Sequence, residues 1–243
     1  MVIPDRLFHY TSIETLALIL SGRKIKFCSL SGVNDLKEGL SRDLGDFRKY
    51  IFVCCWTENI KESIPLWQMY TPQMCGVRIA LPYPFFDMYK YRDKAILFSK
   101  DELIQDEYMI FPYLEPIIRV EYSDDNEKIR PGTYHSSEMF EGIEILKLAK
   151  YKEEMWSFEK EIRFGFVVHP LKHGARYSFE EFINDKPDPP FTEHFIPFSE
   201  KSFEQMEITL GPKTSDSHST IVESLVEKFN PKACVMKSKI EIR

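Results

Sequence analysis

The chain has 243 residues, of which 43% are hydrophobic and 29% charged, and this composition is ordinary for a globular protein with a buried core. Its 32 Lys and Arg face 38 Asp and Glu, so the net charge is −6. This balance excludes general binding of polyanions, although a local basic groove remains compatible with it. The 14% aromatic content argues against a disordered chain.

The sequence predicts neither a membrane-spanning helix nor a signal peptide. No run approaches the roughly 18 to 20 apolar residues that a membrane-spanning helix needs. The first residues lack the basic start, apolar run and small-residue cleavage site of a signal peptide. We therefore expect a cytoplasmic protein without a membrane partner.

The cysteines and histidines show no metal-binding spacing. The five cysteines contain no C-x-x-C pair, and we expect reduced, mostly buried thiols. Of the six histidines, only His169 and His173 are close, and Pro170 between them disfavours a helical metal pair. The sequence therefore predicts no metal site.

The first elements are a short strand that carries His9 and a helix that follows it directly. Thr11 and Glu14 have the spacing of a capping box, and apolar residues then recur on one helical face. Gly22 stands where a helix commonly ends. Residues 25–29 follow as a strand, and residues 32–35 as a turn.

The remaining elements are read from periodicity and from turn residues. A short helix opens near Pro65 and carries Trp67 and Tyr70 on the same face. Residues 138–152 and 216–229 are predicted helices, 82–116 is read as one irregular helix, and 170–203 is rich in loops. The predicted strands are 51–57, 76–81, 117–122, 161–167, 205–210 and 233–241. These elements indicate one α+β domain over residues 1–243, in which helices flank central mixed or antiparallel sheets.

The strand 161–167 is the first candidate for a functional site. Its apolar face alternates with a face that carries Glu161, Arg163 and Gly165. These charges either keep a sheet edge solvated or place a carboxylate at a cleft. In the second reading Arg163 holds Glu161 ionised or binds an anion, and Gly165 leaves room for a ligand.

Other candidate residues also have two interpretations. His9 and Tyr10 lie at a strand-to-helix junction, where free N–H groups favour phosphate, or His9 simply packs locally. Asn34, Asp35 and Glu38 are turn residues or ligand contacts. Trp67 and Tyr70 are core aromatics or a stacking platform. No Walker loop, G-x-G-x-x-G, G-x-S-x-G or H-E-x-x-H motif occurs.

Five motifs together resemble a bacterial family, domain of unknown function 2971. They occur in order over nearly the whole chain, and the fourth is the most specific. They are F-H-Y-T-S (8–12), S-x-x-x-x-N-D-x-x-E (29–38), L-W-x-x-Y (66–70) with G-V-R-I-A-L (76–81), W-x-x-E-x-E-x-R (156–163) and I-T-L-G-P-K (208–213).

A more distant resemblance is to the ADP-ribosyltransferase superfamily. The shared plan is a histidine on the first strand, a helix directly after it, a middle aromatic and a glutamate on a late strand. The resemblance implies that His9 grips a ribose of NAD, that Tyr70 stacks on nicotinamide and that Glu161 bonds the ribose 2′-hydroxyl. Trp67 and Tyr10 are alternatives for the aromatic. The chain departs from the plan because no S-T-S motif is present.

This resemblance implies an NAD-dependent transferase whose catalytic residue is Glu161. The residues expected to bind NAD are His9, Tyr10, Thr11, Asn34, Trp67, Tyr70 and Arg163. The acceptor is a protein, a nucleic acid or a small molecule, and a toxin or antiphage defence role is expected. The alternatives are a nucleotide-binding sensor without turnover and an RNA-directed nuclease or phosphotransferase in which His9, Arg78 and Arg163 contact phosphate.

Overall fold

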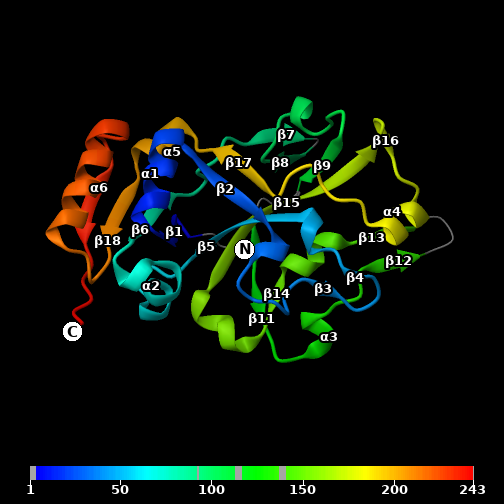
Figure 1. The fold of residues 1–243 in the computed structure, drawn as a ribbon, viewed down its shortest axis with the longest axis horizontal. Coiled ribbons are helices and arrows are strands. Elements are labelled where there is room, and N and C mark those ends of the chain that lie inside the picture. Colours follow the sequence, from blue (N-terminus) through cyan, green and yellow to red (C-terminus); the bar gives the residue numbers. More distant parts are fainter. Residues whose placement is uncertain (1–3, 92, 113–116, 137–140, 243) are drawn as a thin grey trace.

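A large mixed sheet with several helices forms an α+β fold (Figure 1). The computed structural model describes residues 4–91, 93–112, 117–136 and 141–242. The helices are α1 Ile13–Gly22, α2 Ile64–Tyr70, α3 Asn126–Ile129, α4 Phe179–Asp185, α5 Glu200–Glu204 and α6 Asp216–Phe229. No helix in these ranges is long and apolar enough to span a membrane.

Most of the long strands belong to the large sheet. They are β1 Arg6–Thr11, β2 Lys24–Ser29, β5 Ile51–Thr57, β6 Val77–Pro82, β9 Tyr108–Pro112, β10 Ile118–Arg119, β15 Glu161–Lys172, β16 Ala175–Arg176, β17 Glu193–Pro197, β18 Glu207–Leu210 and β19 Cys234–Lys237. Two-stranded pairs are formed by β3 Leu40–Ser41 with β4 Gly45–Asp46, β7 Tyr89–Tyr91 with β8 Lys94–Ile96, β11 Glu121–Tyr122 with β14 Tyr151–Lys152, and β12 Tyr134–Ser136 with β13 Glu141–Ile143.

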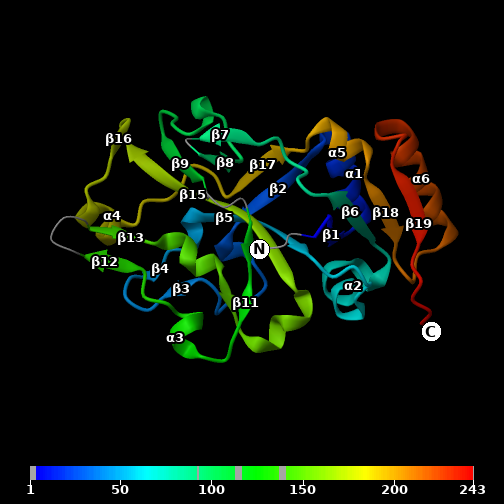
Figure 2. The same ribbon diagram turned by 180° about the vertical axis from the view of Figure 1, so that it is seen from behind.

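The sheet follows the order β10-β15-β5-β1-β6-β18-β19. Its neighbouring strands are antiparallel, except that β18 and β19 run parallel. β15 continues past β5 to pair with β9 and β16, while β2 pairs with β5 and β17. In Figure 1, α6, α1 and α2 lie toward one end of the molecule, and α4 and β16 lie toward the other; Figure 2 shows β19 beside α6.

The sheet is split beside β5, and this split positions the functional site. Every residue of β5 pairs with β15, so any other strand that pairs with β5 must use the opposite edge of β5. At that edge Thr57 pairs with Phe8 of β1, whereas Val53 pairs with Cys28 of β2. β1 and β2 therefore diverge from β5, and α1 connects them.

The helix after β1 begins one residue later than its sequence predicts. Ser12, rather than Thr11, is the N-cap, and its hydroxyl accepts a hydrogen bond from the backbone N–H of Thr15 at 3.1 Å. The left-handed residue at the end of the helix is Arg23, with φ 50°, and Gly22 is the last helical residue. The capping-box and C′ assignments were therefore wrong by one residue.

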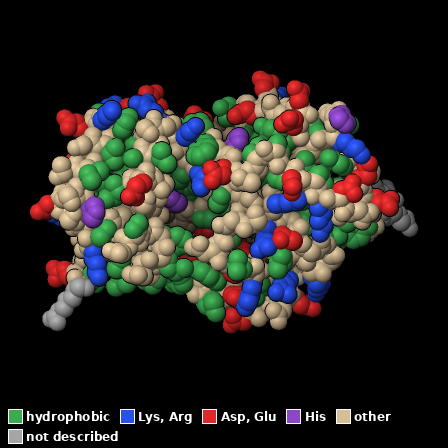
Figure 3. Space-filling view, in the orientation of Figure 1, with side chains coloured by type: hydrophobic (Ala, Val, Ile, Leu, Met, Phe, Trp, Pro, Cys, Tyr) green, Lys and Arg blue, Asp and Glu red, His purple; other side chains and the backbone are tan. Residues whose placement is uncertain are grey.

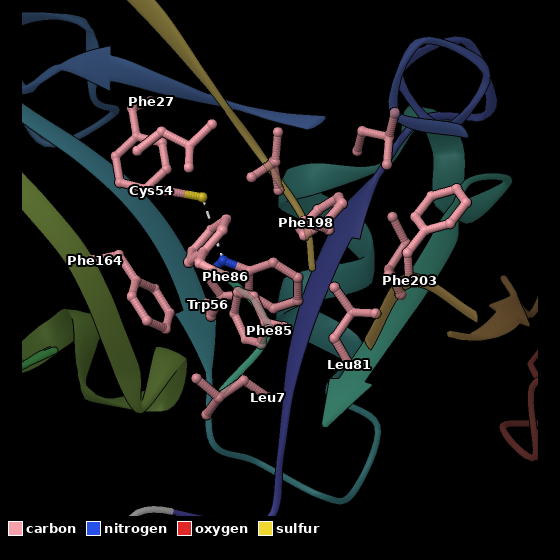
Figure 4. Packing of buried hydrophobic residues seen from close by; sticks show 14 of the residues in the cluster. Leu7, Phe27, Cys54, Trp56, Leu81, Phe85, Phe86, Phe164, Phe198 and Phe203 are labelled. Carbon is pink, nitrogen blue, oxygen red and sulfur yellow. Dashed lines mark hydrogen bonds between the residues drawn. The ribbon is translucent and has the colours of Figure 1, made fainter. Parts of the chain in front are cut away.

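An aromatic cluster forms the core between the sheet and the segment after β6 (Figure 4). Trp56 packs against Phe85 with ring centroids 4.4 Å apart, and Phe164 and Phe86 also lie against Phe85. The indole N–H of Trp56 donates to the sulfur of Cys54 at 3.3 Å. Trp56 is thus anchored on the face of β5 opposite to Cys55.

Several predicted elements are confirmed. The strand 51–57 coincides with β5 and the helix 216–229 with α6. β6, β18 and β19 lie within one to four residues of their predicted bounds, and β15 begins at residue 161 as expected but continues to residue 172. The central sheet is mixed, as the sequence indicated.

Four assignments were wrong, because the structure around each segment overrides its local sequence pattern. In 138–152, the described part contains β13, a 3₁₀ helix over Ile145–Ala149 and β14, while 138–140 lie outside the described residues. In 82–116, the described part contains β7, β8, a 3₁₀ helix over Lys100–Glu102 and β9 instead of one irregular helix, while 92 and 113–116 lie outside the described residues. The strand 117–122 is divided between β10 and β11. The loop-rich segment 170–203 contains α4, β17 and α5.

Candidate functional site

A cavity of about 760 Å³ occupies the split between β1 and β2. One wall is the side of α1, with Thr15, Leu18, Ile19 and Gly22, and the opposite wall belongs to β2 and β17. β5 and β15 form the floor, and α2 closes one end. Figure 3 shows the molecule hollowed near the middle of this face. The volume is in the range of sites that enclose ligands of drug or nucleotide size.

The cavity floor holds a buried cluster of three carboxylates and two cations, which we call the charge cluster. Each of the five side chains is at most 6% exposed. The cluster consists of Glu38, Lys152, Glu159, Glu161 and Arg163. Buried charges of this kind persist only when they are paired and hydrogen-bonded.

Arg163 holds Glu161 in one orientation. Its Nε donates to Oε1 and its Nη2 to Oε2 of Glu161, both at 2.8 Å. The remaining terminal nitrogen, Nη1, donates to Glu38 and to the carbonyl of Ala149. The Arg163 side chain is fully buried. The interpretation in which Arg163 binds a ligand anion was therefore wrong: its guanidinium is engaged by protein oxygens and holds Glu161 in place.

Lys152 joins the three carboxylates from the cavity side. Its ammonium donates to Oε2 of Glu159 at 2.6 Å and to Oε2 of Glu161 at 3.2 Å, and lies 3.7 Å from Oε2 of Glu38. That last oxygen is buried and has no hydrogen-bond partner among the described residues. The phenol of Tyr70 on α2 donates to Oε1 of Glu159. The cluster thus continues from β15 to the helical end of the cavity.

The pKa values of the three carboxyl groups are shifted in different directions. Burial raises the pKa of the Glu161 carboxyl, but the charges of Arg163 and Lys152 outweigh this and lower the pKa to about 2. For Glu38, burial outweighs the attraction of Arg163, so its pKa is raised. Burial and the charge of Glu161 also raise the pKa of Glu159. Glu161 is consequently the carboxyl group whose pKa is lowered, whereas those of Glu38 and Glu159 are raised.

His9 presents an acceptor nitrogen. Its Nδ1 lies 2.9 Å from the carbonyl oxygen of Cys55, and because a carbonyl only accepts, Nδ1 carries the proton. Burial lowers the pKa of His9, although this bond opposes the shift. The neutral ring therefore keeps an unprotonated Nε2, and the ring lines the cavity beside Trp56.

The structure brings most of the predicted site residues together. His9, Tyr10, Thr11, Asn34, Tyr70, Glu161 and Arg163 all line the cavity. Tyr10 is 6% exposed, however, and its hydroxyl accepts from the backbone N–H of Ser63 at 3.0 Å. Trp67 is fully buried, packs edge-on against Tyr10 and does not line the cavity. Among the proposed aromatics, this leaves Tyr70 best placed to meet a ligand.

Two other expectations about the site were wrong. Gly165 provides no room for a ligand, because a Cβ there meets the carbonyl oxygen of Phe52 at 3.2 Å and side chains of Ile118 and Val53 at 3.6 Å. The cavity also runs along the side of α1 instead of facing its N-terminal N–H groups. The helix start is therefore not where a phosphate would bind.

Sequence reasoning missed two members of the charge cluster. For Glu38 the sequence predicts either a turn residue or a ligand contact, and only its place in the 29–38 motif distinguishes it from other glutamates. Lys152 lies four residues before the 156–163 motif in a segment read as a helix, and no pattern marked it. Glu159 belongs to the 156–163 motif and lines the cavity together with Glu161.

No family model matches the sequence, and searches of the curated proteins and of the solved structures found no match. The two resemblances therefore rest on the sequence motifs alone, and the cavity is the remaining evidence for function.

Proposed function

We propose that the protein uses NAD to transfer ADP-ribose to a macromolecule or a small molecule. The observation that carries this proposal is that His9 of β1 and the ionised Glu161 of β15 line one cavity of nucleotide size. These residues are 152 positions apart (161 − 9), yet the split sheet brings them to the same site. A role in toxicity or antiphage defence is part of the proposal.

The charge of Glu161 suits the chemistry. Cleavage of the bond between nicotinamide and ribose develops positive charge on the ribose, and a carboxylate that is already oriented stabilises it. Its pKa of about 2 keeps Glu161 anionic at neutral pH. Arg163 fixes the carboxylate, so no reorientation is needed when the charge develops.

The other cavity residues supply binding. The unprotonated Nε2 of His9 accepts a hydrogen bond, which a ribose hydroxyl can donate. The ring of Tyr70 is half-buried at the end of the cavity and offers a surface for the nicotinamide ring. Apolar residues of α1, such as Leu18 and Ile19, complete the walls.

The test is to measure NAD binding by calorimetry and nicotinamide release by chromatography. Glu161→Gln should lower turnover by about a hundredfold or more with little change in affinity, because its interaction strengthens only in the transition state. His9→Ala should weaken both binding and turnover. Undiminished turnover in Glu161→Gln would reject Glu161 as the catalytic residue. Absence of nicotinamide release by the wild-type protein, with labelled NAD and a cell lysate as acceptor, would reject the proposed activity.

One observation favours a second candidate, a nucleotide-binding sensor without turnover. Arg163 contacts both oxygens of Glu161, and Lys152 contacts one of them. A carboxylate so fully paired serves a rigid binding site as well as it serves catalysis. The sensor predicts tight binding that survives Glu161→Gln and no product over hours. The RNA-directed alternative is less favoured, because Arg78 and Arg163 are both buried.

A further inference from the structure

The floor of the cavity and the wall formed by β2 and β17 carry different charged groups. The floor carries the charge cluster, in which Glu161 is anionic and both cations are paired with carboxyl groups. The wall formed by β2 and β17 carries the exposed lysines of the site, Lys24 and Lys26. Figure 3 shows basic and acidic side chains beside the hollow. A ligand with opposite charges at two points would therefore be oriented along the cavity.

The alternation of β2 aims both lysines at the cavity. Ile25 and Phe27 are buried in the core, so Lys24, Lys26 and Cys28 share the other face. Cys28 pairs with Val53 on the floor strand. Because each strand residue advances by about 3.4 Å, the Cα atoms of Lys26 and Lys24 lie about 7 and about 14 Å from that of Cys28. The lysines thus line the route from the floor to the mouth.

The two lysines differ in their partners. Lys26 pairs with Glu193 of β17 at 2.9 Å, and both side chains are 49% exposed. No described carboxylate lies within 4.0 Å of the Lys24 ammonium, which sits 4.9 Å from the ring centroid of Phe195. An exposed pair such as Lys26–Glu193 contributes little and opens readily, and Lys24 keeps its charge unneutralised.

We propose that Lys24 and Lys26 form a phosphate subsite of the cavity, specific for the pyrophosphate of a dinucleotide. On the floor, the ammonium of Lys152 and the guanidinium of Arg163 are buried and paired with carboxyl groups, so neither is available to a phosphate. A phosphate held at β2 leaves the attached ribose and its cationic ring directed toward the floor. Identification of the ligand as NAD rests on the proposed function, whereas the subsite itself requires only a phosphate-bearing ligand.

The experiment compares ligands with and without phosphate. Calorimetry should show that the double variant Lys24→Gln/Lys26→Gln binds NAD and ADP-ribose at least tenfold more weakly than wild type. Binding of nicotinamide riboside, which lacks phosphate, should be unchanged. The dependence of ADP-ribose affinity on salt should be weaker in the double variant. Lys228→Gln, on the exposed face of α6, is the matched control and should bind all three ligands as wild type does.

A second variant should strengthen binding, a result that a loss of folding could not produce. Glu193→Gln releases Lys26 from its ion pair without touching the floor, and it should tighten ADP-ribose binding severalfold. Equal affinity of wild type and the double variant for ADP-ribose would overturn the subsite, as would failure of wild type to bind NAD, ADP-ribose or pyrophosphate. Lysine-dependent binding of ADP-ribose without nicotinamide release would support the subsite while rejecting the proposed activity.

Discussion

Arg163 grips Glu161 with two parallel hydrogen bonds of 2.8 Å, and their side chains are 0% and 6% exposed. The two residues stand two positions apart on β15, so their side chains leave the same face of the strand. Such a fork fixes the plane of the carboxylate as well as its position. The ionised state of Glu161 and its orientation therefore have a common cause.

Replacing the guanidinium of Arg163 by a lysine ammonium should separate the ionised state of Glu161 from its orientation. Arg163→Lys keeps a cation but cannot donate two parallel bonds, so we expect turnover to fall by about tenfold or more while NAD affinity changes little. Arg163→Met leaves Glu161 and Glu38 without their shared partner and should destabilise the fold by about 3 to 5 kcal/mol. Urea unfolding and single-turnover kinetics measure the two outcomes. Wild-type turnover in a folded Arg163→Lys variant would show that the orientation of Glu161 is not needed.

Glu38 should act on the site through Arg163 and Lys152. It is 0% exposed and does not line the cavity, but it accepts a hydrogen bond from Nη1 of Arg163 and lies 3.7 Å from the ammonium of Lys152, and both cations contact Glu161. Glu38→Gln retains an acceptor for that N–H and should keep most of the stability, whereas Glu38→Ala removes the acceptor and should lose about 3 kcal/mol or more. Thermal and urea unfolding of both variants provides the measurement. Equal stability of Glu38→Ala and wild type would contradict the pairing.

The parts of the fold that the sequence predicted are those with strong local signals. β5 is a continuous apolar run, α6 has an amphipathic period and a serine cap, and the charged face of β15 alternates regularly. One error involves non-local pairing: the segment after residue 140 contains apolar residues, but its strand β14 pairs with β11, about thirty residues earlier in the chain. For the same reason the cavity could be anticipated only as a convergence of residues. Lys152 and Glu38 meet Arg163 through tertiary structure that no local pattern records.

The two proposed aromatics should respond differently to substitution. Tyr70 donates to Glu159 and lines the cavity, so Tyr70→Phe should cost about 1 kcal/mol of stability and preserve NAD affinity, whereas Tyr70→Ala should weaken binding. Trp67→Phe should leave the affinity of the folded protein unchanged and lower its stability, because Trp67 is buried and donates to Glu62 at 3.1 Å. Calorimetry and urea unfolding test both. Weakened NAD binding in a stable Trp67→Phe variant would restore Trp67 as a ligand contact.

Stability should depend on pH through His9. Burial lowers the pKa of native His9 below its ordinary value of 6.5, so as the pH falls below about 6.5 the unfolded chain takes up a proton that the native protein does not. The free energy of unfolding should therefore fall between about pH 6.5 and the lowered native pKa, by at most about 1.4 kcal/mol per pH unit for this residue. Above about pH 7 this contribution is constant.

His9→Gln provides the comparison, because glutamine cannot be protonated in this range. His169 and His194 also have pKa values lowered by burial and contribute equally to both proteins, so the difference between the two urea-unfolding curves isolates His9. We expect the difference in the free energy of unfolding between wild type and His9→Gln to become smaller as the pH falls from about 7 to about 5. NAD affinity of the wild type should decline over the lower part of the same range, since protonation of Nε2 removes its acceptor lone pair. A gap that is independent of pH would mean that native His9 titrates like a histidine in solvent, and the acceptor role assigned to Nε2 would have to be abandoned.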